Sequence, residues 1–148
     1  MDIIIKDDWD IPINSSNVAG TIFFSVSGHF FPCFNYSDFP LVCIISWLGN
    51  LQHFFDRNNI IQPCETKLFF FDGPYTLQII LISKRKIQIS FYDREMESMR
   101  YETNISTFCN LIIRKTELLI QIAEDHNIQS NKIREQLEGF MIAVRHYL

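Results

Sequence analysis

The stretch that decides the fold runs from Lys67 to Tyr92. It reads Lys67-Leu68-Phe69-Phe70-Phe71, the turn Asp72-Gly73-Pro74, the run Tyr75-Thr76-Leu77-Gln78-Ile79-Ile80-Leu81, the basic tip Ser83-Lys84-Arg85-Lys86 and a third run from Ile87 to Tyr92. Apolar runs rich in β-branched and aromatic residues, broken by turn-forming residues, are typical of consecutive antiparallel strands. We therefore predict linked hairpins over this stretch.

Other elements are predicted on both sides of the hairpins. Apolar residues at helical spacing predict three helices, over residues 40–55, over residues 106–123 and beyond Ser130. Short β-rich runs predict strands over residues 20–27, 29–34 and 99–103. Loops are expected over residues 12–17 and 56–64 and over the charged segment 93–98. The expected helix caps are Ser37 or Asp38, then Ser106, then Ser130.

Strands and helices do not alternate regularly, so a parallel βαβ arrangement is not indicated. The predicted class is α+β, with a single antiparallel sheet packed against three helices, the last two forming a C-terminal pair. A chain of 148 residues predicts one domain, residues 1–148, and its 47% hydrophobic content suffices for a core.

Several broad classes are disfavoured by composition. The acidic N-terminus does not resemble a signal peptide, and no apolar run approaches the 18 or so residues of a membrane span. We therefore expect a cytoplasmic protein. The four cysteines, Cys33, Cys43, Cys64 and Cys109, form no Cys-x-x-Cys pair and are expected to be reduced, small core residues, although two disulfides remain an alternative.

Charge is distributed unevenly along the chain. Residues 1–65 carry seven acidic and two basic side chains, and residues 66–148 carry ten acidic and eleven basic ones, which gives the net charge of −4. The acidic first part favours a basic protein partner over a phosphate backbone, because phosphate binding depends on clustered Lys and Arg.

Candidate chemistry in the sequence is sparse. No metal site is predicted from the four dispersed histidines, no phosphate-cradling glycine loop is present, and no cofactor is expected. A small enzyme with a site assembled from Asp72, Cys109 and a histidine such as His126 is one alternative, but Asp72-Gly73-Pro74 is better interpreted as a turn. A nucleic-acid-binding module using Lys84, Arg85 and Lys86 is another, although such a tip commonly keeps a sheet soluble.

A second kind of pattern favours protein binding. Asp7, Asp8 and Asp10 surround Trp9, so carboxylates for Lys or Arg adjoin a large apolar side chain, although Trp9 in the core is the alternative interpretation. The predicted partner-binding residues are Asp7, Asp8, Trp9, Asp10, Asp93, Glu95 and Glu97.

The layout of the chain resembles the small immunity proteins of bacterial contact-dependent and other polymorphic toxin systems. The resemblance lies in Phe23-Phe24 or Phe30-Phe31, in Tyr36-Ser37-Asp38-Phe39 before a helix with Trp47, in residues 68–75 and in the helical C-terminus. It implies a cytoplasmic inhibitor, with no catalytic residues, that binds the C-terminal domain of a toxin one-to-one. That toxin domain is expected to be basic and to be a nuclease, and complementary charge would speed the encounter.

Overall fold

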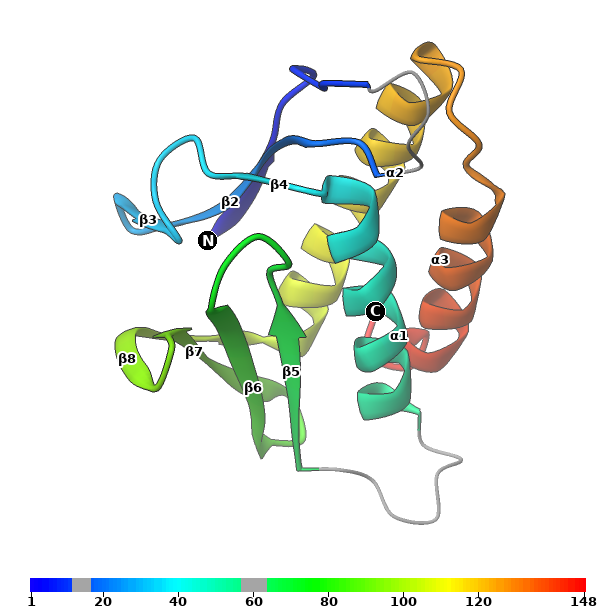
Figure 1. The fold of residues 1–148 in the computed structure, drawn as a ribbon. Helices are drawn as coiled ribbons and strands as arrows, with labels where there is room; N and C mark the ends of the chain where they lie inside the picture. The colour runs from blue at the N-terminus through cyan, green and yellow to red at the C-terminus, as the bar shows by residue number, and fades with distance from the viewer. Residues whose placement is uncertain (12–16, 57–63) are drawn as a thin grey trace.

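The computed structural model describes residues 1–11, 17–56 and 64–148, which form a mixed fold of helices and antiparallel strands (Figure 1). The strands are β1 (Asp2–Ile5), β2 (Gly20–Val26), β3 (His29–Phe31), β4 (Ser37–Asp38), β5 (Glu65–Phe69), β6 (Tyr75–Ser83), β7 (Lys86–Asp93) and β8 (Met96–Asn104). The helices are α1 (Pro40–Phe55), α2 (Ile105–Asp125) and α3 (Asn131–Val144). The loops predicted over residues 12–17 and 56–64 lie almost wholly outside the described residues.

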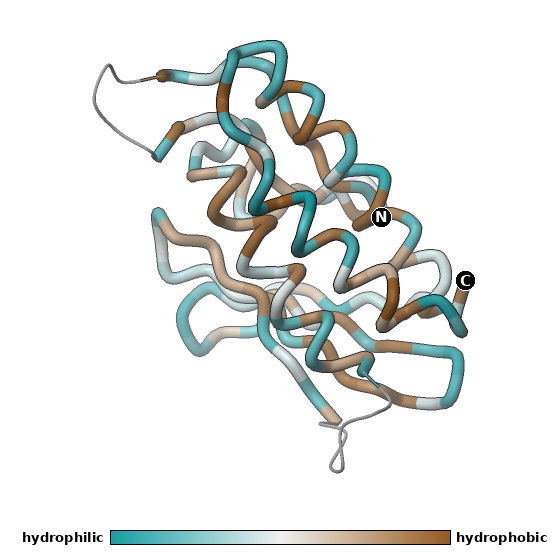
Figure 2. The backbone as a smooth tube through the Cα atoms, turned by 90° about the vertical axis from the view of Figure 1, so that its right-hand side faces the viewer, coloured by the Kyte–Doolittle hydropathy of each residue, from teal (hydrophilic) through white to brown (hydrophobic). Residues whose placement is uncertain are grey.

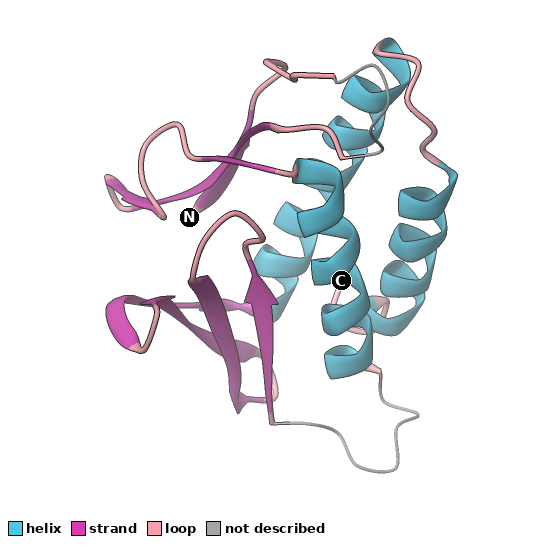
Figure 3. Ribbon diagram, in the orientation of Figure 1, coloured by secondary structure: helices cyan, strands magenta, loops and turns pink. Residues whose placement is uncertain are grey.

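The strands form two four-stranded antiparallel sheets, so the prediction of a single sheet is wrong. In the first sheet, β2 pairs with β1 along one edge and with β3 and β4 along the other, which uses both edges of β2. In the second sheet the strands follow chain order, β5-β6-β7-β8. Helix α1 lies between β4 and β5 in the chain, and β5 packs against α1 instead of pairing with the first sheet (Figure 3).

The hairpins predicted from Lys67 to Tyr92 are confirmed; β6 and β7 are longer than expected, and β5 is shifted so that it ends at Phe69. The predicted loop over residues 93–98 is wrong, because β7 and β8 pair as far as Asp93 and Met96 and leave only two residues in the turn. Arg94 makes that turn with a φ of 56°, in the left-handed region. The charged side chains of this segment therefore lie at the ends of β7 and β8 and in the turn between them, where all are exposed.

The three helices pack beside the two sheets and enclose one core (Figures 1 and 3). Hydrophobic and hydrophilic residues alternate along the helical tubes in Figure 2, as expected for amphipathic helices. Helix α1 lies between β5 and α3, and α2 contacts both β1 and α3. The C-terminal helical pair predicted from the sequence is therefore present.

The predicted side-chain caps are not used as such. The N-cap positions of α1, α2 and α3 are Phe39, Asn104 and Ser130, and none of them makes a side-chain capping hydrogen bond. The Ser130 hydroxyl instead donates to Glu124 Oε1 at 2.7 Å.

Three side chains tie residues 69–72 to the rest of the fold, and we call these contacts the sheet junction. The buried Asp38 carboxylate accepts hydrogen bonds from Phe39 N–H at 2.7 Å and Phe71 N–H at 2.8 Å. Trp47 Nε1 donates to the Phe69 carbonyl at 2.7 Å, and the Tyr36 hydroxyl donates to the Asp72 carbonyl. The first sheet and α1 therefore hold the β5–β6 connection by its main chain.

Glycine is required in that connection. A Cβ on Gly73 would lie 2.7 Å from the Tyr36 hydroxyl oxygen and 2.8 Å from two ring carbons of Tyr75. The Asp72-Gly73-Pro74 segment is thus a turn packed against aromatic side chains, in agreement with the interpretation preferred from the sequence.

The thiols divide into two environments. All four cysteines are free; Cys43 and Cys109 are buried, as expected for small core residues, whereas Cys33 and Cys64 are exposed. Burial raises the pKa of Cys109 to about 12.

Within the described residues, no helix combines the length and apolar character needed to cross a bilayer.

Candidate binding surface

Asp8, one of the predicted partner-binding residues, is engaged within the fold. Its carboxylate accepts hydrogen bonds from the Thr21 N–H at 2.9 Å and from the Thr21 hydroxyl. Burial would raise the pKa of Asp8, but these hydrogen bonds outweigh that effect and hold the pKa below its ordinary value. Asp8 therefore fastens the segment after β1 to the start of β2.

Trp9 is buried, which is the alternative that the sequence left open. Its indole lies against Gly20, where a Cβ would come within 2.6 Å of Trp9 Cδ1, and stacks on the His126 ring with centroids 5.8 Å apart. Asp7 pairs with His126 Nε2. Of the three N-terminal acids, Asp10 is exposed and forms no ion pair within the described residues.

The second predicted group lies at the β7–β8 turn. Glu97 forms a two-point ion pair with Arg100, at 3.0 Å from Oε1 to Nε and 2.9 Å from Oε2 to Nη2. This pairing with Arg100 lowers the pKa of Glu97. Asp93 and Glu95 are exposed and form no ion pair in the described part of the chain, so both carboxylates are available to a partner.

A groove of about 350 Å³ lies between the two sheets beside this turn. We call it the intersheet groove, and its lining residues are His29, Phe30, Phe31, Pro32, Tyr75, Asp93, Ser98 and Met99. Aromatic rings supply much of its wall, with Phe31 and Tyr75 edge to face at 5.8 Å and Phe30 44% exposed. The groove therefore combines apolar wall with one carboxylate, a pairing that the sequence did not reveal because its residues come from separate segments.

The enzymatic constellation considered from the sequence is not assembled. Cys109 lies near the start of α2 and His126 just after its end, 17 residues on, so about 25 Å of helix separates them. A nucleophile and its base need hydrogen-bond contact, near 3 Å. Cys109 is also fully buried, whereas Asp72 is exposed in the β5–β6 connection.

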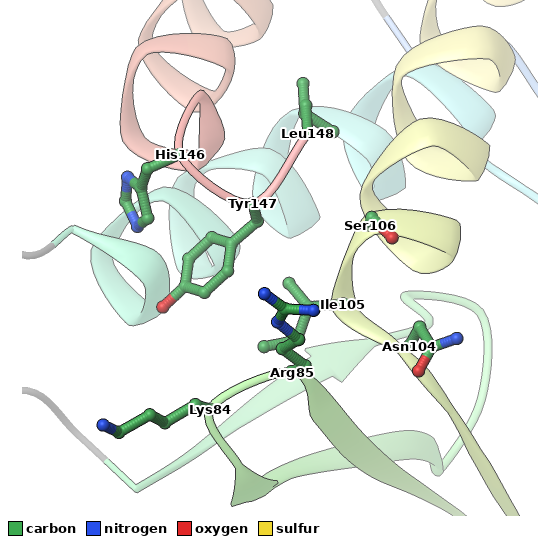
Figure 4. Close-up of a pocket in the computed structure, with 8 residues that line it drawn as sticks. All are labelled: Lys84, Arg85, Asn104, Ile105, Ser106, His146, Tyr147 and Leu148. Carbon is green, nitrogen blue, oxygen red and sulfur yellow. The ribbon is translucent and has the colours of Figure 1, made fainter.

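The basic tip adjoins a cavity of about 590 Å³ (Figure 4). Its wall comes from the β6–β7 turn, the start of α2 and the C-terminal segment, as Lys84, Arg85, Asn104, Ile105, Ser106, His146, Tyr147 and Leu148. Figure 4 shows Arg85 between the start of α2 and Tyr147, with Lys84 directed away from them. The cationic side chains therefore do not converge on one point.

Metal ligands are not grouped in the described residues, where no three His, Cys, Asp or Glu side chains lie close enough together to hold an ion. Comparison with protein-family models, curated proteins and solved structures finds no match.

Proposed function

We propose that this protein is an immunity protein, which binds a bacterial toxin domain and neutralises it by protein–protein contact. The resemblance described above motivates the proposal. The observation that carries it is the intersheet groove, where the aromatic rings of Phe30, Phe31 and Tyr75 line the same groove as the available Asp93 carboxylate.

The groove fits the side chain of an Arg or Lys on a basic partner. A guanidinium attracts the faces of aromatic rings such as Phe30 and Tyr75 and forms charge-assisted hydrogen bonds with a carboxylate such as Asp93. Glu95, at the adjacent turn, adds a second available carboxylate. We therefore take the groove and the β7–β8 turn as the contact surface.

The N-terminal acids have a different role in this proposal. Asp7 and Asp8 are paired within the fold, so they add to the negative potential more than to direct contact. Such a field speeds the encounter with a basic partner, and salt screens it. The proposal places complex formation in the cytoplasm of the producing cell.

The test first asks whether the neighbouring gene encodes a large secreted protein with a variable C-terminal domain. That domain is then co-expressed with this chain, and cell growth and complex affinity are measured. Asp93→Lys should weaken binding about 30-fold, since loss of a central charged contact costs about 2 kcal/mol. Glu135→Lys makes the same charge change on α3, across the molecule from β3 and β8, and should leave affinity nearly unchanged (Figure 1).

Two outcomes would count against the proposal. Absence of both protection and co-purification would refute the immunity function. Protection with equal effects of the two charge reversals would keep the function and refute the groove as the contact.

Binding of an anionic ligand is the second candidate function. The cavity beside Lys84 and Arg85 favours it, because two exposed cations adjoin a concave surface there. Binding of labelled single-stranded RNA or DNA that falls steeply with salt, and that Arg85→Glu abolishes, would support this function. Salt-independent or undetectable binding would refute it.

A further inference from the structure

Strand β8 forms an open edge of the second sheet. Within the described residues it pairs only with β7, and each of its nine residues is exposed or half-buried. An open edge presents a row of unpaired backbone N–H and C=O groups that can pair with another strand.

The backbone groups on this open edge can be assigned. Ile105 N–H donates to the Arg85 carbonyl at 2.9 Å, so the backbone groups of residue 105 point towards the side of β7. Successive residues of a strand point their backbone groups to opposite sides. The N–H and C=O groups of Arg100 and Glu102 therefore point away from β7, towards solvent.

Proteins usually protect such edges with lysine, proline or a bulge. The segment from Met99 to Asn104 contains neither lysine nor proline. The register irregularity between β7 and β8 lies at Phe91 and Tyr92, near the turn, which leaves this segment regular. Its charges are Arg100 and Glu102, of opposite sign and on the same face two residues apart.

Among the registers that centre antiparallel pairing of β8 with itself on residues 100 to 102, these charges favour one. In a two-fold pairing, facing residues share a face, so one residue of β8 must face its own copy. Centring the pair on Arg100 or on Glu102 sets like charges opposite each other. Centring it on Tyr101 sets Arg100 opposite Glu102 of the second copy, twice, and brings their outward backbone groups into hydrogen-bonding positions.

We propose that two copies of this chain associate through β8, centred on Tyr101, to form one continuous antiparallel sheet. The ion pair of Arg100 with Glu97 does not prevent this, because it uses Nε and Nη2 and leaves the Nη1 donors for a second carboxylate. The proposal does not rest on the toxin-binding function, although Met99 of β8 also lines the intersheet groove.

Sedimentation equilibrium of the purified chain tests the proposal, with Arg100→Glu as an acidic variant and Glu102→Arg as a basic variant. Each variant replaces two attractive cross-strand pairs with two repulsive ones, so each should raise the dimer dissociation constant about ten-fold or more. Mixing the acidic and basic variants should restore association, because every facing pair in the mixed dimer is again opposite in charge. The double variant should also associate.

Two controls separate register from general effects. Lys67→Glu changes charge on β5, at the other end of the same sheet, and should not alter association. Glu102→Pro removes an outward N–H that β7 does not use, so it should weaken the dimer while circular dichroism stays unchanged. A wild-type chain that is monomeric at all concentrations, or a mixture of charge variants that fails to associate, overturns the proposal.

Discussion

Replacing Asp38 should weaken the whole fold by breaking the sheet junction. The Asp38 side chain is 1% exposed, and it accepts from two backbone N–H groups at 2.7 and 2.8 Å. Hydrogen bonds to a charged group contribute about 1.5–3 kcal/mol each, and the orphaned donors recover part of that from water. We expect Asp38→Ala to lower the free energy of unfolding by about 3 kcal/mol.

Urea unfolding followed by tryptophan fluorescence measures this change. With a urea dependence of about 2 kcal/mol per molar for a chain of this size, the unfolding midpoint should fall by about 1.5 M. Asp38→Asn retains one acceptor but turns an amide donor towards a backbone N–H, so it should fall between wild type and Asp38→Ala. Ser37→Ala, at the exposed neighbouring position, should stay within about 0.5 kcal/mol.

The loss of stability in Asp38→Ala shows whether this carboxylate links the two sheets. If Asp38→Ala lowered stability by less than about 1 kcal/mol, no more than a typical surface change, the carboxylate would not be holding the two sheets together. If Asp38→Ala lowered the protection of backbone amides from hydrogen exchange only in the first sheet, Asp38 would likewise not link the two sheets.

Three further outcomes are expected. Gly20→Ala should lower the free energy of unfolding in urea by about 1–3 kcal/mol, because the added Cβ would overlap Trp9. An unchanged free energy would mean that the Trp9 ring can shift to make room for it. Asp8→Ala should destabilise the protein at neutral pH, and its difference from wild type should shrink as pH falls through the lowered pKa of Asp8, since a carboxylate with a depressed folded-state pKa stabilises only when ionised. A thiol reagent should modify the exposed cysteines of the native protein but not Cys109 before unfolding, and rapid Cys109 labelling would contradict its burial.

Local pattern predicted the second sheet well and the first sheet poorly. The runs from Lys67 to Tyr92 are long, regular and separated by clear turns, so their pairing follows from neighbours in the chain. Strand β1 has only four residues, Asp2–Ile5, and pairs with β2 across a long connection. No local sequence signal indicates such a pairing. Nor does one indicate that both edges of β2 are occupied, which keeps β5 out of the first sheet.

The candidate binding surface was likewise predicted only in part from local sequence. The acids at positions 7, 8 and 10 were recognisable as a cluster, but their internal partners, Thr21 and His126, are distant in the sequence. Trp9 is buried because Gly20 leaves room for its ring, a fit that only the fold creates. Charge runs indicate what reaches the surface, and only packing decides which of those charges remain available.

The sheet junction separates geometry from side-chain identity. Tyr36, Asp38 and Trp47 all bind main-chain atoms of residues 69–72, whereas the side chains of Phe69 and Phe71 are 43% and 49% exposed. Substitutions at those two exposed positions, and at Asp72, leave all three hydrogen bonds in place. The turn can therefore acquire new surface chemistry through sequence drift or engineered libraries while the scaffold beneath it keeps its shape.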